Sequence, residues 1–154
     1  MKDLHPEMGS EIIDRITIKA TEGLIQIISS RWGINEMLRV IDGLYRSGEI
    51  DYSGLQRIAA TISERIEHNN REGNFYFTEV DRQIVNVSSV LIPWFGISAD
   101  DALHFCTALL YKCKVFVTAD HKLTNKINNN LKIAVFDLTN KEESEDLATL
   151  LELD

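Results

Sequence analysis

Hydrophobic residues recur along the chain at two spacings, one typical of helices and the other typical of buried strands. Apolar residues spaced three or four positions apart predict helices over about residues 11–22, 31–46, 53–68, 79–91, 100–112 and 142–151. Short runs rich in β-branched and aromatic residues predict strands between them, at 24–29, 75–77, 114–119 and 133–138. Because these helices alternate with these strands, we expect an α/β protein with a largely parallel sheet.

The organisation of the chain predicts one domain spanning residues 1–154. Its length is close to the common size of a single domain, and we find no internal repeat or Pro/Gly-rich linker. The segment 92–98 reads as a connection, and the polar segment 120–130 reads as a short helix or a loop.

Charge and cysteine content narrow the expected partners and location. The net charge is −8, so binding to nucleic acid would need a local basic patch or bound cations. No apolar run approaches the roughly 20 residues of a membrane span, and the first residues lack the apolar core of a signal peptide. Cys106 and Cys113 form no CxxC pair and are expected to be reduced core residues on one helix. These features predict a cytoplasmic protein without a membrane partner.

Acidic residues fall where parallel strands end, which is where such sheets bind ligands. Asp120 follows the strand at 114–119, Asp100 and Asp101 lie in the first turn of a helix, and Glu36 lies early in another. Carboxylates that meet at close range need a counter-charge, and Mg²⁺ or Mn²⁺ prefers oxygen ligands. A bound metal would activate water, so the pattern indicates a metal-dependent phosphodiesterase site.

Each of these acids also has an ordinary structural explanation. Asp100 or Asp101 would stabilise the helix N-terminus through the macrodipole. Asp120 would cap the segment that follows it, and Glu36 would be a surface acid. Only their joint placement beside strand ends favours a functional site.

The segment Ser98–Asp120, SADDALHFCTALLYKCKVFVTAD, resembles the C-terminal half of PIN domains. In that family an Asp opens a helix of the form D-A-x-x-x-x-x-A, matched here by Asp101, Ala102 and Ala108. A strand then ends in T-x-D, matched by Thr118 and Asp120. Upstream, SSRWGINEMLRV is similar to the family's strand-end serine and acid-bearing helix, with Ser30 and Glu36 in those places.

The resemblance implies a parallel sheet with helices on both faces and an acidic pocket for Mg²⁺ or Mn²⁺. It implies Glu36, Asp101 and Asp120 as metal ligands and Thr118 as a supporting hydroxyl, whereas it leaves the role of Asp100 open. Many family members are ribonucleases, including toxins of toxin–antitoxin pairs, and dimers are common. The implied partners are therefore an RNA substrate, an antitoxin-type protein and a second copy of the chain.

The chain departs from the family pattern at its start. PIN domains usually begin with a central apolar strand that ends in D-x-N, whereas MKDLHP is short and polar. A start assigned too late, a truncation, other strands closing the gap, or a degenerate member would each account for this first strand being missing or replaced. Two hypotheses follow: a metal-dependent ribonuclease, or a non-catalytic PIN-like module that binds a protein or RNA partner.

Basic residues after Asp120 are candidates for contacts with RNA. Lys122 and Lys126 lie in the polar segment that follows the acid and would bind phosphates beside the metal site. A solvated polar loop is an equally good interpretation. His104 lies three residues after Asp101 and would face the same side of a helix, although an ordinary helical histidine fits as well.

Overall fold

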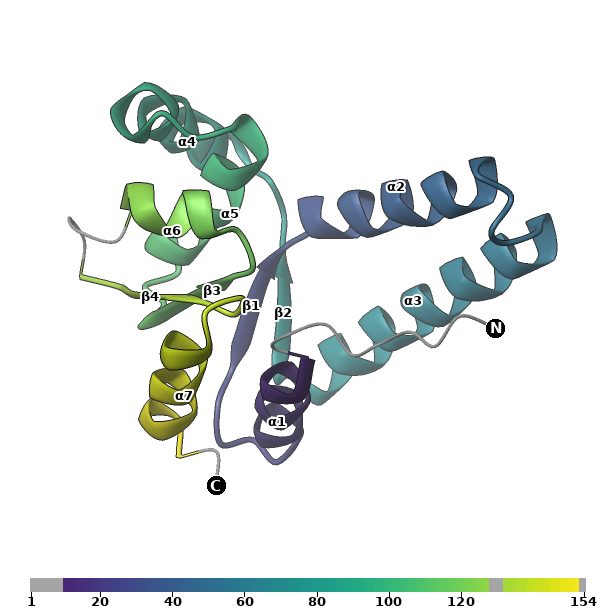
Figure 1. The fold of residues 1–154 in the computed structure, drawn as a ribbon, viewed down its shortest axis with the longest axis horizontal. Helices are drawn as coiled ribbons and strands as arrows, with labels where there is room; N and C mark the ends of the chain where they lie inside the picture. Colours follow the sequence, from purple (N-terminus) through teal and green to yellow (C-terminus); the bar gives the residue numbers. More distant parts are fainter. Residues whose placement is uncertain (1–9, 128–131, 153–154) are drawn as a thin grey trace.

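The computed structural model describes residues 10–127 and 132–152, and these contain seven helices and four short strands (Figure 1). Their order is α1 Ser10–Thr21, β1 Ile27–Ser30, α2 Trp32–Arg46, α3 Tyr52–Glu72, β2 Phe75–Thr78, α4 Arg82–Phe95, α5 Ala99–Leu110, β3 Val115–Thr118, α6 His121–Ile127, β4 Ala134–Asp137 and α7 Lys141–Leu150. The alternation confirms the expected α/β class. In this part of the chain, every helix is too short or too polar to cross a membrane.

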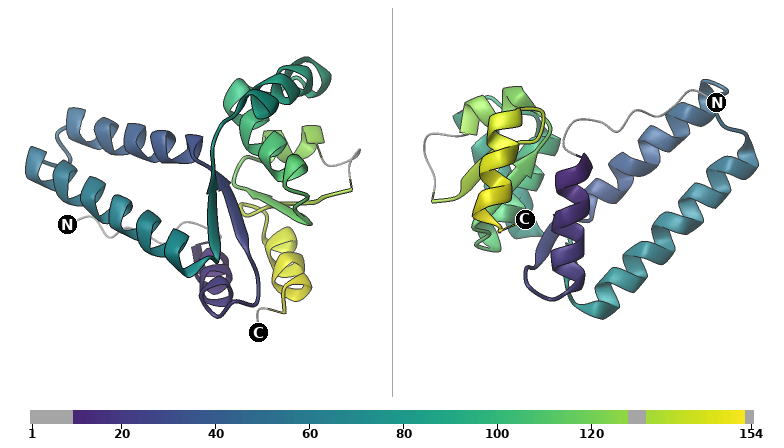
Figure 2. Two further views of the ribbon diagram at one scale, coloured as in Figure 1. Left: turned by 180° about the vertical axis from the view of Figure 1, so that it is seen from behind. Right: turned by 60° about the horizontal axis from the view of Figure 1, so that its bottom comes forward.

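The four strands form two separate parallel pairs (Figures 1 and 2). Strand β1 pairs with β2, with Ile27 opposite Phe75, and β3 pairs with β4, with Val115 opposite Ala134. Within the described residues no ladder joins β1 to β3. The strands are therefore parallel as expected, but they form two two-stranded sheets.

Two apolar clusters cover opposite faces of the β3–β4 pair. One cluster contains Phe105 of α5 and Ile127 of α6, and Phe116 of β3 packs against it. The other contains Ile16 of α1 and Leu147 of α7. It packs against Val115 and Val117, which lie on either side of Phe116 in β3. Because successive strand side chains point to opposite faces, α5 and α1 lie on opposite sides of this pair.

Helices α2 and α3 form a hairpin that projects away from the strands (Figure 1). Asp51 caps α3 by accepting a hydrogen bond from the backbone nitrogen of Gly54 at 2.7 Å. The segment 68–74 was expected to close this helix, and α3 ends within it, at Glu72. It ends there because Gly73 adopts φ = 75°, a left-handed conformation that glycine tolerates best.

Helix α4 ends later in the chain than the sequence predicted. The segment 92–98 was expected to be a connection, yet α4 continues through Pro93 to Phe95. Proline removes one intrahelical hydrogen bond, but here it lies in the last turn, just before the left-handed cap at Gly96. The chain reverses only at Gly96, which places Ser98 at the N-cap of α5.

The two cysteines are free thiols, as expected, but they do not share a helix. Helix α5 ends at Leu110, so Cys113 lies beyond it, after Lys112 adopts φ = 55°. Cys106 is buried and Cys113 is half-buried. Burial raises the pKa of both thiols, because a thiolate is poorly solvated there.

Candidate functional site

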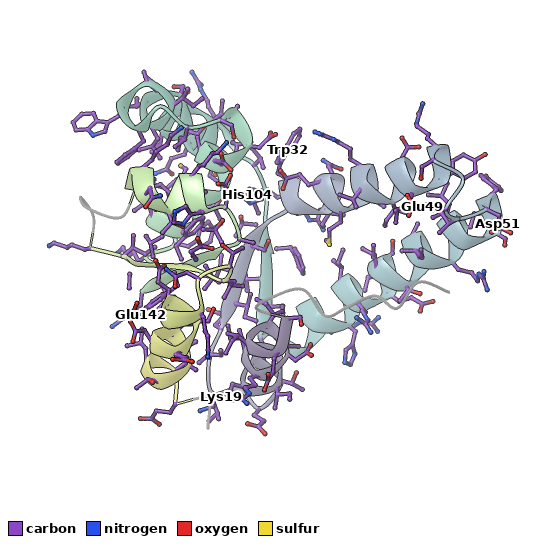
Figure 3. The ribbon with its side chains drawn as sticks, in the orientation of Figure 1. Lys19, Trp32, Glu49, Asp51, His104 and Glu142 are labelled. Carbon is purple, nitrogen blue, oxygen red and sulfur yellow. The ribbon has the colours of Figure 1, made fainter. Side chains whose placement is uncertain are left out.

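A hydrogen-bonded pair of side chains joins α2 to α5. The Nε2 atom of His104 lies 2.6 Å from Oε2 of Glu36. Their side chains are 25% and 39% exposed, so the pair is partly screened by water. Figure 3 shows His104 where the start of α2 meets the body of the molecule. Glu36 is thus held at this junction by a residue from α5.

Asp101 is held in the first turn of α5 by the cap residue Ser98. The Ser98 hydroxyl donates to Oδ2 of Asp101 at 2.7 Å and accepts from the Asp101 backbone nitrogen at 3.1 Å. This reciprocal pattern satisfies one free N–H of the helix N-terminus and fixes the carboxylate. Asp101 therefore lies in the first turn of α5, as expected, and takes part in the hydrogen bonds that cap this helix.

Asp100 forms a different contact from its neighbour. Its Oδ1 atom accepts a hydrogen bond from Nε1 of Trp32 at 2.9 Å, which again links α5 to the start of α2. Trp32 is labelled at this junction in Figure 3. Asp100 therefore has a structural partner of its own in this arrangement.

Asp120 caps α6, which was the structural explanation considered for it. Its Oδ1 atom accepts from the backbone nitrogens of Lys122 at 2.8 Å and Leu123 at 3.1 Å. Its own nitrogen donates to the Thr118 hydroxyl at 3.1 Å, so the two residues of the T-x-D motif contact each other. The Asp120 carboxylate remains exposed at the end of β3.

A cavity of about 860 Å³ brings part of the predicted site together. Asp101, His104 and Thr118 line it, whereas Glu36 does not line it and only contacts the lining residue His104. Asp120 is not among the lining residues. Across the described ranges 10–127 and 132–152, no three His, Cys, Asp or Glu side chains lie close enough to hold a metal ion.

The two lysines predicted to contact RNA differ in their surroundings. Lys126 donates from Nζ to the Gly96 carbonyl, which ties α6 to the segment between α4 and α5. Lys122 is exposed next to Asp120. Of the two, Lys122 is better placed to reach a ligand in solvent.

Sequence reasoning missed a second pair, Asp137 with His121. Asp137 is fully buried at the end of β4, and its Oδ2 atom lies 2.9 Å from Nδ1 of His121. Its Oδ1 atom accepts from the Thr139 nitrogen at 2.8 Å and the Thr139 hydroxyl at 2.6 Å. Burial raises the pKa of Asp137, but the bonds from Thr139 and His121 outweigh it and lower the pKa overall. The sequence signal that could have located Asp137 is an acidic residue at the end of an apolar strand.

Comparisons with known proteins identify no relative. No protein-family model matches the chain, and neither the curated proteins nor the solved structures contain a match. Any functional assignment therefore rests on the residues and geometry described above.

Proposed function

We propose that this chain is a PIN-like, Mg²⁺- or Mn²⁺-dependent ribonuclease that uses Glu36, Asp101 and Asp120 as metal ligands. In this proposal the two strand pairs belong to one PIN-like parallel sheet with helices on both faces. The observation that carries the proposal is the shared cavity, since Asp101, Thr118 and the His104 partner of Glu36 all adjoin it. These residues come from separate segments of the chain, as a strand-end site requires.

The chemistry of the donor set suits a hard divalent cation. Three carboxylates and the Thr118 hydroxyl are oxygen ligands of the kind that Mg²⁺ and Mn²⁺ prefer. The Asp120 carboxylate is exposed, and those of Glu36 and Asp101 are partly exposed. When bound, such an ion would lower the pKa of a coordinated water and offset charge on the phosphodiester.

The residues of the chain would orient these ligands and the substrate. His104 holds Glu36, and Ser98 holds Asp101, so two of the three carboxylates have fixed positions. Lys122, exposed beside Asp120, would bind a substrate phosphate and position the RNA backbone. The proposal includes an antitoxin-type partner, a homodimer and a cytoplasmic location, the first two of which follow from the resemblance alone.

A non-catalytic PIN-like module is the second candidate, and one observation favours it. Each of the three acids already has a protein donor: His104 for Glu36, Ser98 for Asp101 and the α6 backbone for Asp120. Among the described residues, the acids also do not gather into a group of three. A module of this kind would bind a protein or RNA partner without cutting it.

Cleavage of RNA separates the two candidates. We would incubate the protein with a mixed-sequence single-stranded RNA, with either Mn²⁺ or EDTA present. Asp101→Asn removes a proposed ligand, and Asp146→Asn, an exposed acid on α7, is the matched control. Cleavage that requires Mn²⁺ and is lost only in Asp101→Asn supports the ribonuclease. Wild-type protein that leaves the RNA intact at millimolar Mn²⁺ contradicts it and favours the binding module.

A further inference from the structure

Trp32 is an exposed aromatic residue whose backbone and ring are both held by hydrogen bonds. Its backbone nitrogen lies 3.1 Å from the hydroxyl of the buried Ser30, and its indole Nε1 donates to Oδ1 of Asp100 at 2.9 Å. Trp32 nevertheless remains 37% exposed. Because the indole N–H lies in the plane of the ring, the contact with Asp100 orients the ring without itself covering either ring face.

The position of Trp32 places it beside two of the proposed metal ligands. It opens α2 one helical turn before Glu36, so the two side chains lie within about 40° of each other around the helix. Its acceptor Asp100 directly precedes Asp101 in α5. The indole is thus held between the segments that carry Glu36 and Asp101, at the junction labelled in Figure 3.

The face of α2 that carries Trp32 is polar. Arg39 is exposed and lies within about 20° of Trp32 around the helix axis, two turns farther along. The exposed apolar residues Met37 and Leu38 lie about 120° or more away from Trp32. Trp32 therefore does not extend the exposed apolar surface of α2, as an aromatic anchor for an apolar protein partner would.

A nucleobase and its phosphates match this combination of an aromatic ring with acidic and basic side chains. Bases of single-stranded nucleic acid stack on aromatic side chains, whereas arginines bind the phosphates. A base carries no charge, so it can lie next to Asp100 without the repulsion that a phosphate would meet. Arg31 is already paired with Glu79 at 2.7 Å, which makes Arg39 the better candidate for a phosphate contact.

We infer that Trp32 is a stacking platform for one unpaired RNA base, next to the phosphate that the proposed metal site would bind. Arg39 binds a phosphate farther along the same strand. A base inside a duplex is already stacked on both sides, so the RNA is single-stranded at this position. The inference rests on the ribonuclease proposal for the class of ligand, but stacking on Trp32 requires no cleavage.

Tryptophan fluorescence tests the stacking directly. Trp32 is the single tryptophan of the Trp94→Phe protein, and Trp94 is the single tryptophan of the Trp32→Phe protein. Each would be titrated in Mn²⁺ with a mixed-sequence RNA of about ten nucleotides, whose phosphorothioate linkages resist hydrolysis. An abasic strand of the same length and linkages is the matched ligand control. We expect saturable quenching of Trp32 by the RNA, no quenching of Trp32 by the abasic strand, and none of Trp94 by either.

Affinities separate stacking from a purely structural role of Trp32. Trp32→Ala should weaken RNA binding about tenfold, as expected for the loss of one stacked base, and should leave the weaker binding of the abasic strand unchanged. Trp32→Phe keeps an aromatic ring and should retain most of the RNA affinity. A structural role alone would weaken the binding of both strands equally. Trp94→Ala, a change at a residue that is 75% exposed on α4, should bind both strands as the wild type does.

Two results would overturn the inference: quenching of equal size by the abasic strand, or RNA binding that Trp32→Ala leaves unchanged. Should Trp32→Ala fail to fold, the titration of the Trp94→Phe protein still decides between stacking and its absence.

Cleavage of an unmodified RNA in Mn²⁺ distinguishes failure of the platform from failure of the ribonuclease. Cleavage without quenching of Trp32 overturns the platform and leaves the ribonuclease standing. Quenching without cleavage supports the platform and favours the non-catalytic RNA-binding module. If neither occurs, both proposals fail, and a protein partner becomes the ligand to seek at Trp32.

Discussion

The Nε2 atom of His104 lies 2.6 Å from Oε2 of Glu36, across 68 positions of sequence. This contact joins the projecting α2–α3 hairpin to α5, where Asp101 lies one turn before His104. The position of one proposed metal ligand therefore depends on a histidine that is not itself a proposed ligand.

We predict a measurable coupling between His104 and Glu36. The single variants His104→Ala and Glu36→Ala and the double variant form a double-mutant cycle in urea unfolding. Because both side chains are partly exposed, we expect a coupling free energy of about 1 kcal/mol. A cycle of His104→Ala with Glu64→Ala, an exposed acid on α3, should give none. Equal coupling free energies in the two cycles would contradict a specific interaction between His104 and Glu36.

Asp137 is predicted to make the free energy of unfolding depend on pH. Its pKa lies below the ordinary value of 3.8, so the ionised form is favoured in the folded state. Its contribution is complete above pH 3.8 and is lost as the pH falls through the folded pKa. Asp137→Asn should reduce the free energy of unfolding by about 2 kcal/mol at pH 7 and by much less near pH 2.

Urea unfolding midpoints at the two pH values would measure this difference. Thr139→Val removes a hydroxyl that donates to the same carboxylate, so it should show a smaller loss with the same pH dependence. A loss in Asp137→Asn that is equally large at both pH values would contradict the assignment to the ionised carboxylate.

Leu147 is predicted to be essential to the cluster that joins α1 to α7. Its side chain is fully buried, whereas Leu150 on the same helix is 55% exposed. Leu147→Ala should lower the free energy of unfolding by about 3 kcal/mol, because it leaves a cavity in the core. Leu150→Ala should cost less than about 1 kcal/mol. Similar losses in the two variants would show that α7 does not pack as described.

Asp100 is predicted to position Trp32. With Trp94→Phe in the background, Trp32 is the single tryptophan, since the chain has two. Asp100→Ala removes the acceptor at 2.9 Å, so we expect the indole to gain water contact and its emission to move to longer wavelength. Asp100→Asn keeps an acceptor oxygen and should emit nearly as the parent does. Unchanged emission in Asp100→Ala would contradict this contact.

Local features of the structure could be predicted from the sequence because they depend on neighbouring residues. The apolar spacing located all of the long helices, and the placement of Asp101 in the first turn of α5 is confirmed. The capping interaction of Asp120, one of two alternatives considered, also follows from its position before a polar helix.

Features that depend on distant residues could not be predicted. The pairing of β1 with β2 and of β3 with β4, without a ladder between β1 and β3, depends on contacts across the whole fold. The Glu36–His104 pair depends on how α2 meets α5. The persistence of α4 through Pro93 shows a helix continuing against a local breaking signal, because its apolar residues still pack.

The binding of Mn²⁺ tests the central claim, a metal site formed by Glu36, Asp101 and Asp120. Melting temperatures would be recorded against Mn²⁺ concentration for the wild type, Asp101→Asn, Asp120→Asn and the control Asp146→Asn. A site that binds only the folded state stabilises it by about 1.4 kcal/mol at ten times Kd. We predict a rise in melting temperature for the wild type and the control and none for the other two variants. No rise in the wild type, or an equal rise in all four proteins, would contradict the claim.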